Sequence, residues 1–198
     1  MADVNLAAED QPMRSDARRN RRRLLDAATE LILEIGGEPS RAAVAEAAGV
    51  GIGTLYRHFT DQQDLLRGVA LDALDRTIAA GEAALNEADG EAALRRYLHA
   101  AIDIGLGAVN IVHPLLDNVD WPEQRTAAEN VLDRLVDAAH RDEAIPTAIN
   151  ATDIALATIR FCRPLAIGFD TAEERAIAHR QLDSYLDGLA TTTNSSSG

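Results

Sequence analysis

Apolar residues recur every three to four positions along most of this 198-residue chain, which is the spacing of one face of an amphipathic helix. Alanine and leucine dominate, and long runs of valine, isoleucine and threonine are missing, so the pattern favours an all-α protein. Glycines and prolines interrupt it at the points where helices are expected to end. The predicted helices span 16–35, 42–48, 52–59, 61–87, 91–109, 122–142, 151–163 and 171–190, with one or two further turns within 115–119.

The segment SRAAVAEAAGVGIGTLYRHFTDQQDLL, residues 40–66, predicts two short helices joined by a tight turn and followed by a third helix. Ser40 is suited to cap the first helix, because its hydroxyl can accept a bond from a free amide of the first turn. Gly49 is suited to the left-handed backbone that ends it. Thr60, with Gln63 three residues later, has the spacing of a capping box for the third helix. This arrangement predicts a helix-turn-helix, whose second helix lies in the DNA major groove.

The predicted second helix has two different faces. Ile52, Leu55 and Phe59 fall on one apolar arc, which is expected to face the core. The opposite arc is expected to meet DNA, and it carries Gly53, Thr54, Arg57 and His58, with Tyr56 at its border. An arginine in this place can pair in bidentate fashion with guanine, and a threonine can contact a thymine methyl group or a phosphate.

The run AEAAGVGIGTLYRHF, followed by QQDLL, resembles the signature of the tetracycline-repressor (TetR) family of bacterial transcriptional regulators, over about residues 18–74. The resemblance implies a homodimer with a helical C-terminal ligand domain, released from its operator when a small molecule binds. Two positions depart from the family pattern: Gln62 stands where a phosphate-binding lysine is usual, and Gly51 where serine is frequent. The expected DNA-binding residues are Arg22, Ser40, Arg41, Gly53, Thr54, Tyr56, Arg57, His58 and Gln62.

Charge is unevenly distributed along the chain. The net charge is −13, yet six arginines lie between Arg14 and Arg23 against one acidic residue, Asp16. These arginines can reach phosphates or the minor groove, although a merely solvated helix end would have the same composition. The acidic remainder is expected to keep the rest of the chain away from DNA. The single cysteine, Cys162, and the lack of a long apolar run or a signal peptide predict a cytoplasmic protein with no disulfide framework and no membrane segment.

Ligand-binding residues are expected among the C-terminal helices, in a mostly apolar cavity with a few polar groups. The candidates are Tyr97, His99, Asp103, His113, Asp117, Trp121, Arg160 and Phe161. Asp103 and Asp117 beside Trp121 would suit a cationic ligand, whereas a lining with few aromatic residues would suit an aliphatic one. Pairs one turn apart, such as His99 with Asp103, suggest a metal site only weakly, so no metal and no cofactor is predicted.

The last two helices are the candidate dimer interface, as the family resemblance implies. Apolar side chains recur along them at helical spacing, at Ile159, Ala178, Leu182, Tyr185 and Leu189. The same residues would equally complete the core of a single chain. Thr171, with Glu174, has the spacing of a capping box at the start of the last helix.

The predicted organisation is a flexible arm (1–15), a helix-turn-helix DNA-binding domain (16–64), a helical ligand-binding and dimerisation domain (65–190) and a disordered tail (191–198). Motifs of common enzymes are missing, and Gly49, Gly51 and Gly53 do not match a dinucleotide-binding loop, so no enzymatic activity is predicted. The expected function is that of a ligand-responsive homodimeric repressor released from a palindromic operator. The alternatives are a DNA-binding regulator that senses thiol oxidation at Cys162, between Arg160 and Arg163, or one that needs no ligand.

Overall fold

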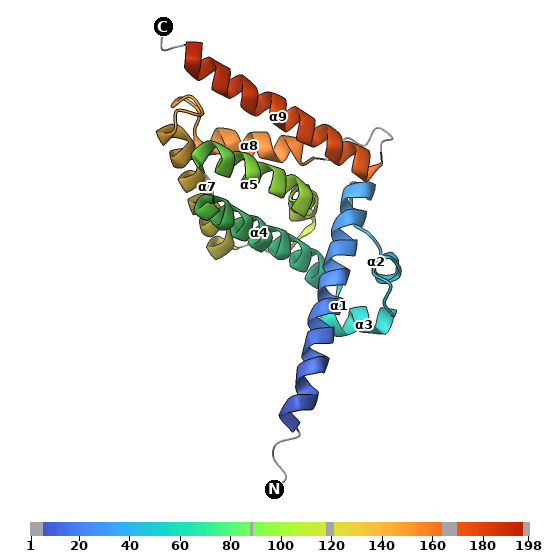
Figure 1. Ribbon diagram of the computed structural model, residues 1–198. Helices are drawn as coiled ribbons and strands as arrows, with labels where there is room; N and C mark the ends of the chain where they lie inside the picture. The colour runs from blue at the N-terminus through green and yellow to red at the C-terminus, as the bar shows by residue number, and fades with distance from the viewer. Residues whose placement is uncertain (1–5, 88, 118–120, 164–169, 196–198) are drawn as a thin grey trace.

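The computed structural model describes residues 6–87, 89–117, 121–163 and 170–195, and within them it contains α-helices, one 3₁₀ turn and no strand (Figure 1). The all-helical prediction is therefore confirmed. The elements are α1 (Leu6–Ile35), α2 (Arg41–Ala47), α3 (Ile52–His58), α4 (Gln62–Glu87), α5 (Gly90–Ile104), α6 (Gly107–Val112), η1 (His113–Leu115), α7 (Pro122–Arg141), α8 (Ala151–Phe161) and α9 (Thr171–Ser195).

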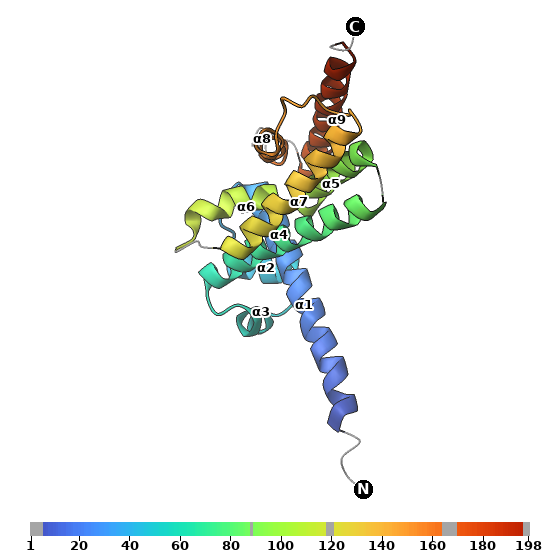
Figure 2. The ribbon, with the colours of Figure 1, turned by 90° about the vertical axis from the view of Figure 1, so that its left-hand side faces the viewer.

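The helices form two units that share α4. In Figures 1 and 2, α2 and α3 lie beside α1 at one end of the molecule, and α9 lies at the other end. The N-terminal unit has its own core, formed by α1, α2, α3 and the first part of α4, and α6 packs onto it through Ala108 and Val112. The second core is formed by the rest of α4 together with α5, α7, α8 and α9.

The core of the N-terminal unit extends beyond the predicted boundary at residue 64. Leu65, Leu66, Val69 and Ala70 of α4 are buried in it together with Leu55 and Phe59. Because α4 continues from this core into the second one, it joins the two units as a continuous helix. The connection between them is therefore stiff.

Several helix ends differ from the prediction. The first helix begins at Leu6 rather than Asp16 and continues through Pro12. The last helix continues to Ser195, whereas residues 191–198 were predicted to be disordered, and 196–198 lie outside the described residues. The predicted helix 91–109 is divided into α5 and α6 because Gly105 adopts a left-handed conformation, with φ of 81°.

Both predicted capping boxes are wrong, and in each an aspartate beside the threonine is the cap. At α4, Asp61 accepts the backbone N–H of Asp64 at 2.8 Å, and the Asp64 carboxylate accepts the N–H of Thr60 at 2.9 Å. At α9, Asp170 accepts the N–H of Glu173 at 2.8 Å. A carboxylate is the stronger acceptor at a helix N-terminus, because it also interacts favourably with the helix dipole.

No single described helix is long and apolar enough to cross a membrane. Helices α5 and α6 with η1 pass the test of length and composition together, but they meet at a bend of 55°. Most of the apolar side chains of this pair are buried in the two cores, and buried core helices pass the same test.

Candidate DNA-binding and ligand-binding sites

Local interactions build the turn between α2 and α3. The hydroxyl of Ser40 accepts the N–H of Ala43 at 3.2 Å, which confirms it as the N-cap of α2. Gly49 has φ of 61°, as expected for the residue that ends this helix. Leu55 of α3 and Phe59, which follows the helix as its C-cap, are fully buried in the N-terminal core, so two large apolar side chains set the orientation of α3.

The other face of α3 is open to solvent. Tyr56 and Arg57 are exposed, and the Arg57 guanidinium bonds back to the Gly53 carbonyl at 3.3 Å and the Thr54 hydroxyl at 2.9 Å. The guanidinium of Arg41 lies over the Tyr56 ring, 4.8 Å from its centroid. These side chains come from α2 and α3 and form one surface that combines hydrogen-bond donors with an aromatic ring, which suits contact with base edges and phosphates.

His58 lies at the edge of this surface and is partly buried. Desolvation by burial, followed by the nearby guanidinium groups of Arg21 and Arg57, lowers the pKa of His58 below its ordinary value. The ring is therefore neutral at pH 7 and offers one donor and one acceptor rather than a charge.

Ile52 does not face the core as predicted: its side chain is 41% exposed. It is the first residue of α3, and Leu55 and Phe59, one and two turns later, are the residues that enter the core. An exposed isoleucine at the start of this helix is a candidate for apolar contact with thymine methyl groups.

Gln62, at the usual position of a phosphate-binding lysine, is partly buried. Its side-chain amide donates to the Pro39 carbonyl at 2.9 Å, which holds the loop before α2 against the start of α4. The structure thus gives Gln62 a role in positioning the helix-turn-helix.

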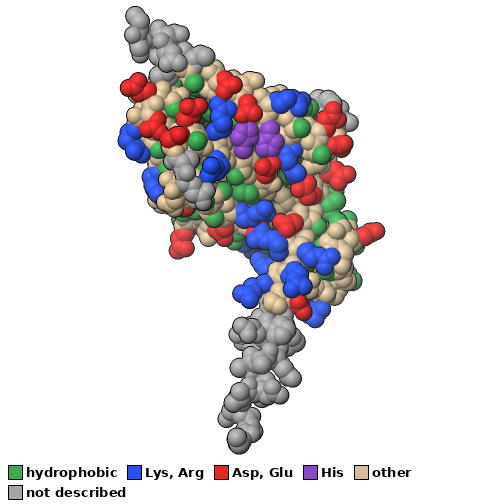
Figure 3. All heavy atoms as spheres, viewed as in Figure 1, with side chains coloured by type: hydrophobic (Ala, Val, Ile, Leu, Met, Phe, Trp, Pro, Cys, Tyr) green, Lys and Arg blue, Asp and Glu red, His purple; other side chains and the backbone are tan. Residues whose placement is uncertain are grey.

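The described arginines of α1 differ in their contacts: Arg19 pairs with Asp16 of its own helix at 3.6 Å, whereas others reach neighbouring elements. Arg22 donates to Asp72 of α4 at 2.6 Å, within a network completed by Asp26 and Arg76. Arg21 lies over the Phe59 ring at 4.6 Å, and Arg23 reaches the Gly49 carbonyl at 3.4 Å. Arg18 and Arg19 lie nearer the N-terminus of α1 and have exposed side chains. The side chain of Arg14 lies outside the described residues. In Figure 3, basic side chains gather over this end of the molecule.

The helical body contains a cavity of about 370 Å³ between α4, α5, α6, α7 and α8. It includes three of the predicted ligand-binding residues: Tyr97, His113 and Trp121. His113 and Trp121 are in edge-to-face contact, with ring centroids 6.3 Å apart. Burial, followed by the proximity of Cys162, raises the pKa of Tyr97 to about 12, so this phenol stays neutral and able to donate.

The rest of the cavity lining was missed at the level of sequence, because it comes from helices far apart in the chain. It is mostly apolar, with one ion pair between Arg125 and Glu129 at 3.8 Å and the hydroxyl of Thr158. The apolar lining residues are Leu74, Leu106, Val109, Ala128, Leu132, Ala155 and Ile159. A periodic pattern identifies buried helix faces, but it does not show where two such faces stand apart.

Five predicted ligand-binding residues do not line this cavity. His99 and Asp103 lie at the contact of α5 with α9, where they meet other partners. The backbone N–H of Asp117 bonds to the Gln63 side chain at 3.2 Å, and Arg160 is exposed. Phe161 lines a smaller cavity, of about 40 Å³.

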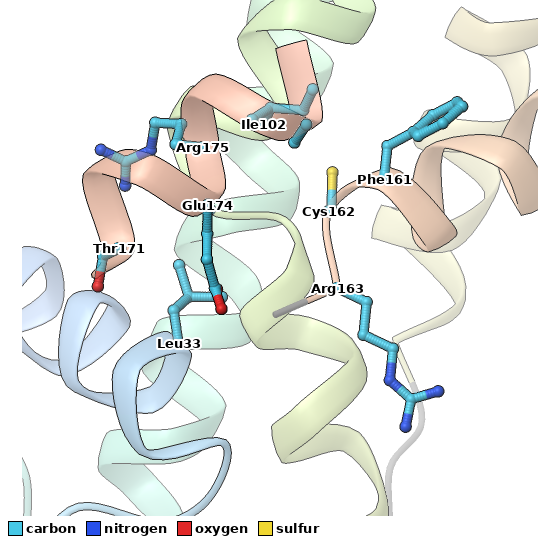
Figure 4. A pocket seen from close by; sticks show the side chains of 10 residues that line it. Leu33, Ile102, Phe161, Cys162, Arg163, Thr171, Glu174 and Arg175 are labelled. Atoms are coloured by element: carbon cyan, nitrogen blue, oxygen red, sulfur yellow. The ribbon is translucent and has the colours of Figure 1, made fainter. Parts of the chain in front are cut away.

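Figure 4 shows this smaller cavity at the junction of the two units. Leu33 approaches it from α1, Glu174 from α9, and Cys162 from the end of α8, whereas the Arg163 side chain extends away. Its volume is close to that of a single small molecule such as water. It therefore marks imperfect packing between units rather than room for an organic ligand.

The predicted dimer residues divide into two groups. Ala178 and Leu182 are buried within the second core, so they stabilise the chain's own fold. Tyr185 and Leu189 are partly exposed, and Ile159 is 39% exposed with Leu156 beside it at 49%. The exposed apolar residues thus lie mainly on α8.

Comparison with known proteins agrees with this architecture. The model of the family of bacterial regulatory proteins called tetR matches residues 24–69. An HTH-type transcriptional regulator of Staphylococcus aureus is 45% identical over 64 residues, which are 32% of this chain and 35% of that protein. The chain therefore matches about a third of the length of its curated relatives.

Solved structures extend the similarity to the helical body. A TetR transcriptional regulator from Streptomyces coelicolor has a TM-score of 0.63 and 28% identity, covering 86% of this chain and 98% of that one. One from Mycobacterium vanbaalenii has a TM-score of 0.64 and 26% identity, covering 90% and 99%. The TetR-like regulator LfrR from Mycobacterium smegmatis, solved with proflavine, has a TM-score of 0.57 and 26% identity, covering 84% and 96%.

A helix-turn-helix held on a helical body is the architecture of DNA-binding transcriptional regulators. Residues 24–69 match the TetR family, and the described chain has the fold of solved TetR transcriptional regulators.

Proposed function

We propose that the protein is a homodimeric repressor that a small molecule releases from its operator. Each subunit would place α3 in one of two successive major grooves of a near-palindromic site. Arg57 would contact guanine, while Tyr56, Arg41 and the exposed Arg18 and Arg19 would hold the phosphate backbone. The exposed face of α3 and the solvent exposure of Arg18 and Arg19 support this assignment.

The single observation that carries ligand response is the cavity of about 370 Å³, because its walls also belong to the core of the DNA-binding unit. Val109 lines the cavity, while its neighbours Ala108 and Val112 on α6 are buried against α1 and α4. The Gln63 side chain at the start of α4 donates to the Leu115 carbonyl at 3.0 Å, just after α6. A ligand that displaces α6 would therefore move the base of the helix-turn-helix.

Release then follows from differential affinity. A ligand that binds more tightly to a conformation with altered spacing between the two recognition helices lowers the operator affinity by the same factor. The apolar lining with Trp121 and Tyr97 suits a planar or aliphatic ligand, and Glu129 offers one carboxylate near the opening. Asp103 and Asp117 lie outside the cavity, so they do not support the predicted cationic site. The similar regulator LfrR was solved with proflavine, which supports a ligand of this size.

Dimerisation is proposed through α8 and α9. Leu156 and Ile159 form an apolar patch on α8, and an open groove between α8 and α9 is lined by Phe161 and Ile177. A second copy of the chain related by a two-fold axis would cover the same patch on both subunits.

The redox alternative is disfavoured by the position of Cys162. Burial raises the pKa of its thiol to about 12, and the reactive thiolate is scarcely populated at neutral pH. The ligand-independent alternative is disfavoured by the cavity itself, since interiors normally leave few voids of this size.

The test begins with selection of bound sequences from a random DNA duplex pool, which should return an inverted repeat. Release is then measured by displacing the protein from that duplex with proflavine and a panel of other planar and aliphatic compounds. Ala128→Trp should fill the cavity and abolish release while operator binding persists. Ala83→Trp, at an exposed position of α4, is the matched control and should leave release unchanged. Unchanged release in Ala128→Trp would contradict the assignment of the cavity.

A further inference from the structure

Two histidines from distant parts of the chain meet at the surface between α5 and α9. The rings of His99 and His179 stack with centroids 4.9 Å apart and planes 21° apart. Their Nδ1 atoms are separated by 2.6 Å, and both side chains are about a quarter exposed. In Figure 3, two histidine side chains (purple) lie side by side on the face of the body.

The outer nitrogen of each ring is directed at a carboxylate. His99 Nε2 lies 2.9 Å from Asp183 Oδ1, and His179 Nε2 lies 2.9 Å from Asp103 Oδ1. The hydrogen bond from His99, followed by that from Arg95, lowers the pKa of Asp183, which is therefore ionised at neutral pH. An ionised carboxylate only accepts hydrogen bonds, so His99 Nε2 must carry a hydrogen and donate it to Asp183. We assign the same direction to the contact of His179 Nε2 with the Asp103 carboxylate.

This assignment leaves the two Nδ1 atoms in an unusual position. A neutral imidazole has one N–H, so with both hydrogens on Nε2 the two Nδ1 lone pairs would face each other at 2.6 Å. The contact is attractive only if a cation lies between them. A tetrahedral zinc ion, with Zn–N bonds of about 2.0–2.1 Å, would hold the nitrogens more than ~3 Å apart. Within the described ranges no three His, Cys, Asp or Glu side chains are placed to hold a metal.

We propose that His99 and His179 share a single proton, so that an imidazolium–imidazole bridge clasps α5 to α9 and opens when this proton is lost or a second one is bound. The proton is donated by the Nδ1 of one ring and accepted by the Nδ1 of the other. The two flanking carboxylates fix both rings in the required orientation.

The surrounding charges suit one positive charge at the pair. On α5, Arg95 is paired with Asp183 and Asp187 of α9 and with Glu91 of its own helix. Beyond His179, Arg175 is paired with Glu30 of α1 at 2.8 Å. Arg95 and Arg175 are thus paired with carboxylates, while Asp103 and Asp183 each face one imidazole ring.

A shared proton makes the folding stability depend on pH. The folded pair holds one proton, whereas two independent histidines in the unfolded chain hold almost none well above the ordinary imidazole pKa of about 6.5 and almost two well below it. The unfolded state therefore binds fewer protons at alkaline pH and more at acidic pH. Stability from the clasp falls in both directions and is greatest near neutral pH.

The direct test is nitrogen NMR of the ¹⁵N-histidine-labelled protein at pH 7, with the two rings assigned by His99→Gln and His179→Gln. We expect both Nε2 atoms to be protonated and the two Nδ1 atoms to share one proton between them. Two independently titrating neutral rings, or a ring with an unprotonated Nε2, would overturn the proposal.

A second measurement follows the melting temperature from pH 5 to pH 9. The loss caused by His99→Gln or His179→Gln should be largest near neutral pH and shrink toward both ends of the range. His140→Gln is the control, because this ring contacts only the Ile149 carbonyl among its polar partners described, at 3.0 Å, and its effect should not peak there. A difference that changes in one direction only would contradict a shared proton. So would a stoichiometric rise in melting temperature with Zn²⁺ that His99→Gln abolishes, because it would identify a metal bridge.

Discussion

Replacing each of two helix-ending glycines by alanine, in separate variants, measures how tightly the two units pack. Gly36 follows α1 and Gly105 follows α5, and both have positive φ, of 68° and 81°. A Cβ at Gly36 would meet no atom within 4 Å, whereas one at Gly105 would lie 2.7 Å from Thr29 Cγ2. Thr29 is buried and its hydroxyl donates to the Leu25 carbonyl at 2.9 Å, so its side chain is not free to turn away.

The expected magnitudes follow from these two geometries. The left-handed conformation costs an L-residue about 1–2 kcal/mol, and this term applies to Gly36→Ala and Gly105→Ala alike. Forcing an extra methyl group into a packed interior costs about 1–3 kcal/mol more, and only Gly105→Ala incurs it. We therefore expect losses of about 1–2 kcal/mol for Gly36→Ala and about 2–5 kcal/mol in total for Gly105→Ala.

Urea unfolding followed by circular dichroism gives both values, at one fixed protein concentration because an oligomer would make stability depend on concentration. Gly36→Asn and Gly105→Asn serve as companions, since asparagine tolerates the left-handed region better than alanine. Equal losses for the two alanine variants would refute the contact of Gly105 with α1 on which the reasoning depends.

Four further outcomes are expected. Arg57→Ala should weaken operator binding by about 1–3 kcal/mol and relax base preference at one position of each half-site, as quantitative binding to single-base variants would show; equal weakening for all sequences would make Arg57 a phosphate contact. Arg22→Ala should leave the salt dependence of DNA binding nearly unchanged and lower the unfolding free energy by at most about 1 kcal/mol, because its pairing with Asp72 is partly exposed. Trp121→Ala should weaken binding of any displacing compound in calorimetry without changing operator affinity. Because burial raises the pKa of the Cys162 thiol from 9.0 to about 12, the unfolded state loses this proton first, and stability should fall as pH rises through this window; Cys162→Ala should reduce that fall in alkaline denaturation curves.

Much of the DNA-binding unit could be predicted from the sequence because the interactions that shape it are local. Ser40 caps a helix through a residue three positions away, and Gly49 ends it through its own backbone freedom. Such interactions operate within one helical turn, so the order of residues alone indicates them. The same reasoning predicted Thr60 as the N-cap of α4, whereas Asp61 is the cap. Both residue types are good caps, and the residue at which α4 begins decides between them.

The candidate ligand site, the ion pairs and the histidine pair depended on the tertiary structure. The place of Arg22 in a basic run predicts a phosphate contact. In the structure it instead pairs with Asp72, fifty positions later, because α1 packs on α4. His99 and His179 are eighty positions apart, and only the contact of α5 with α9 brings their rings together. Sequence determined where helices form and which faces are apolar, since both follow from neighbours along the chain. Packing decided which faces meet, where a cavity remains between them and which charges are left free, because these depend on distances between helices that no periodic pattern contains.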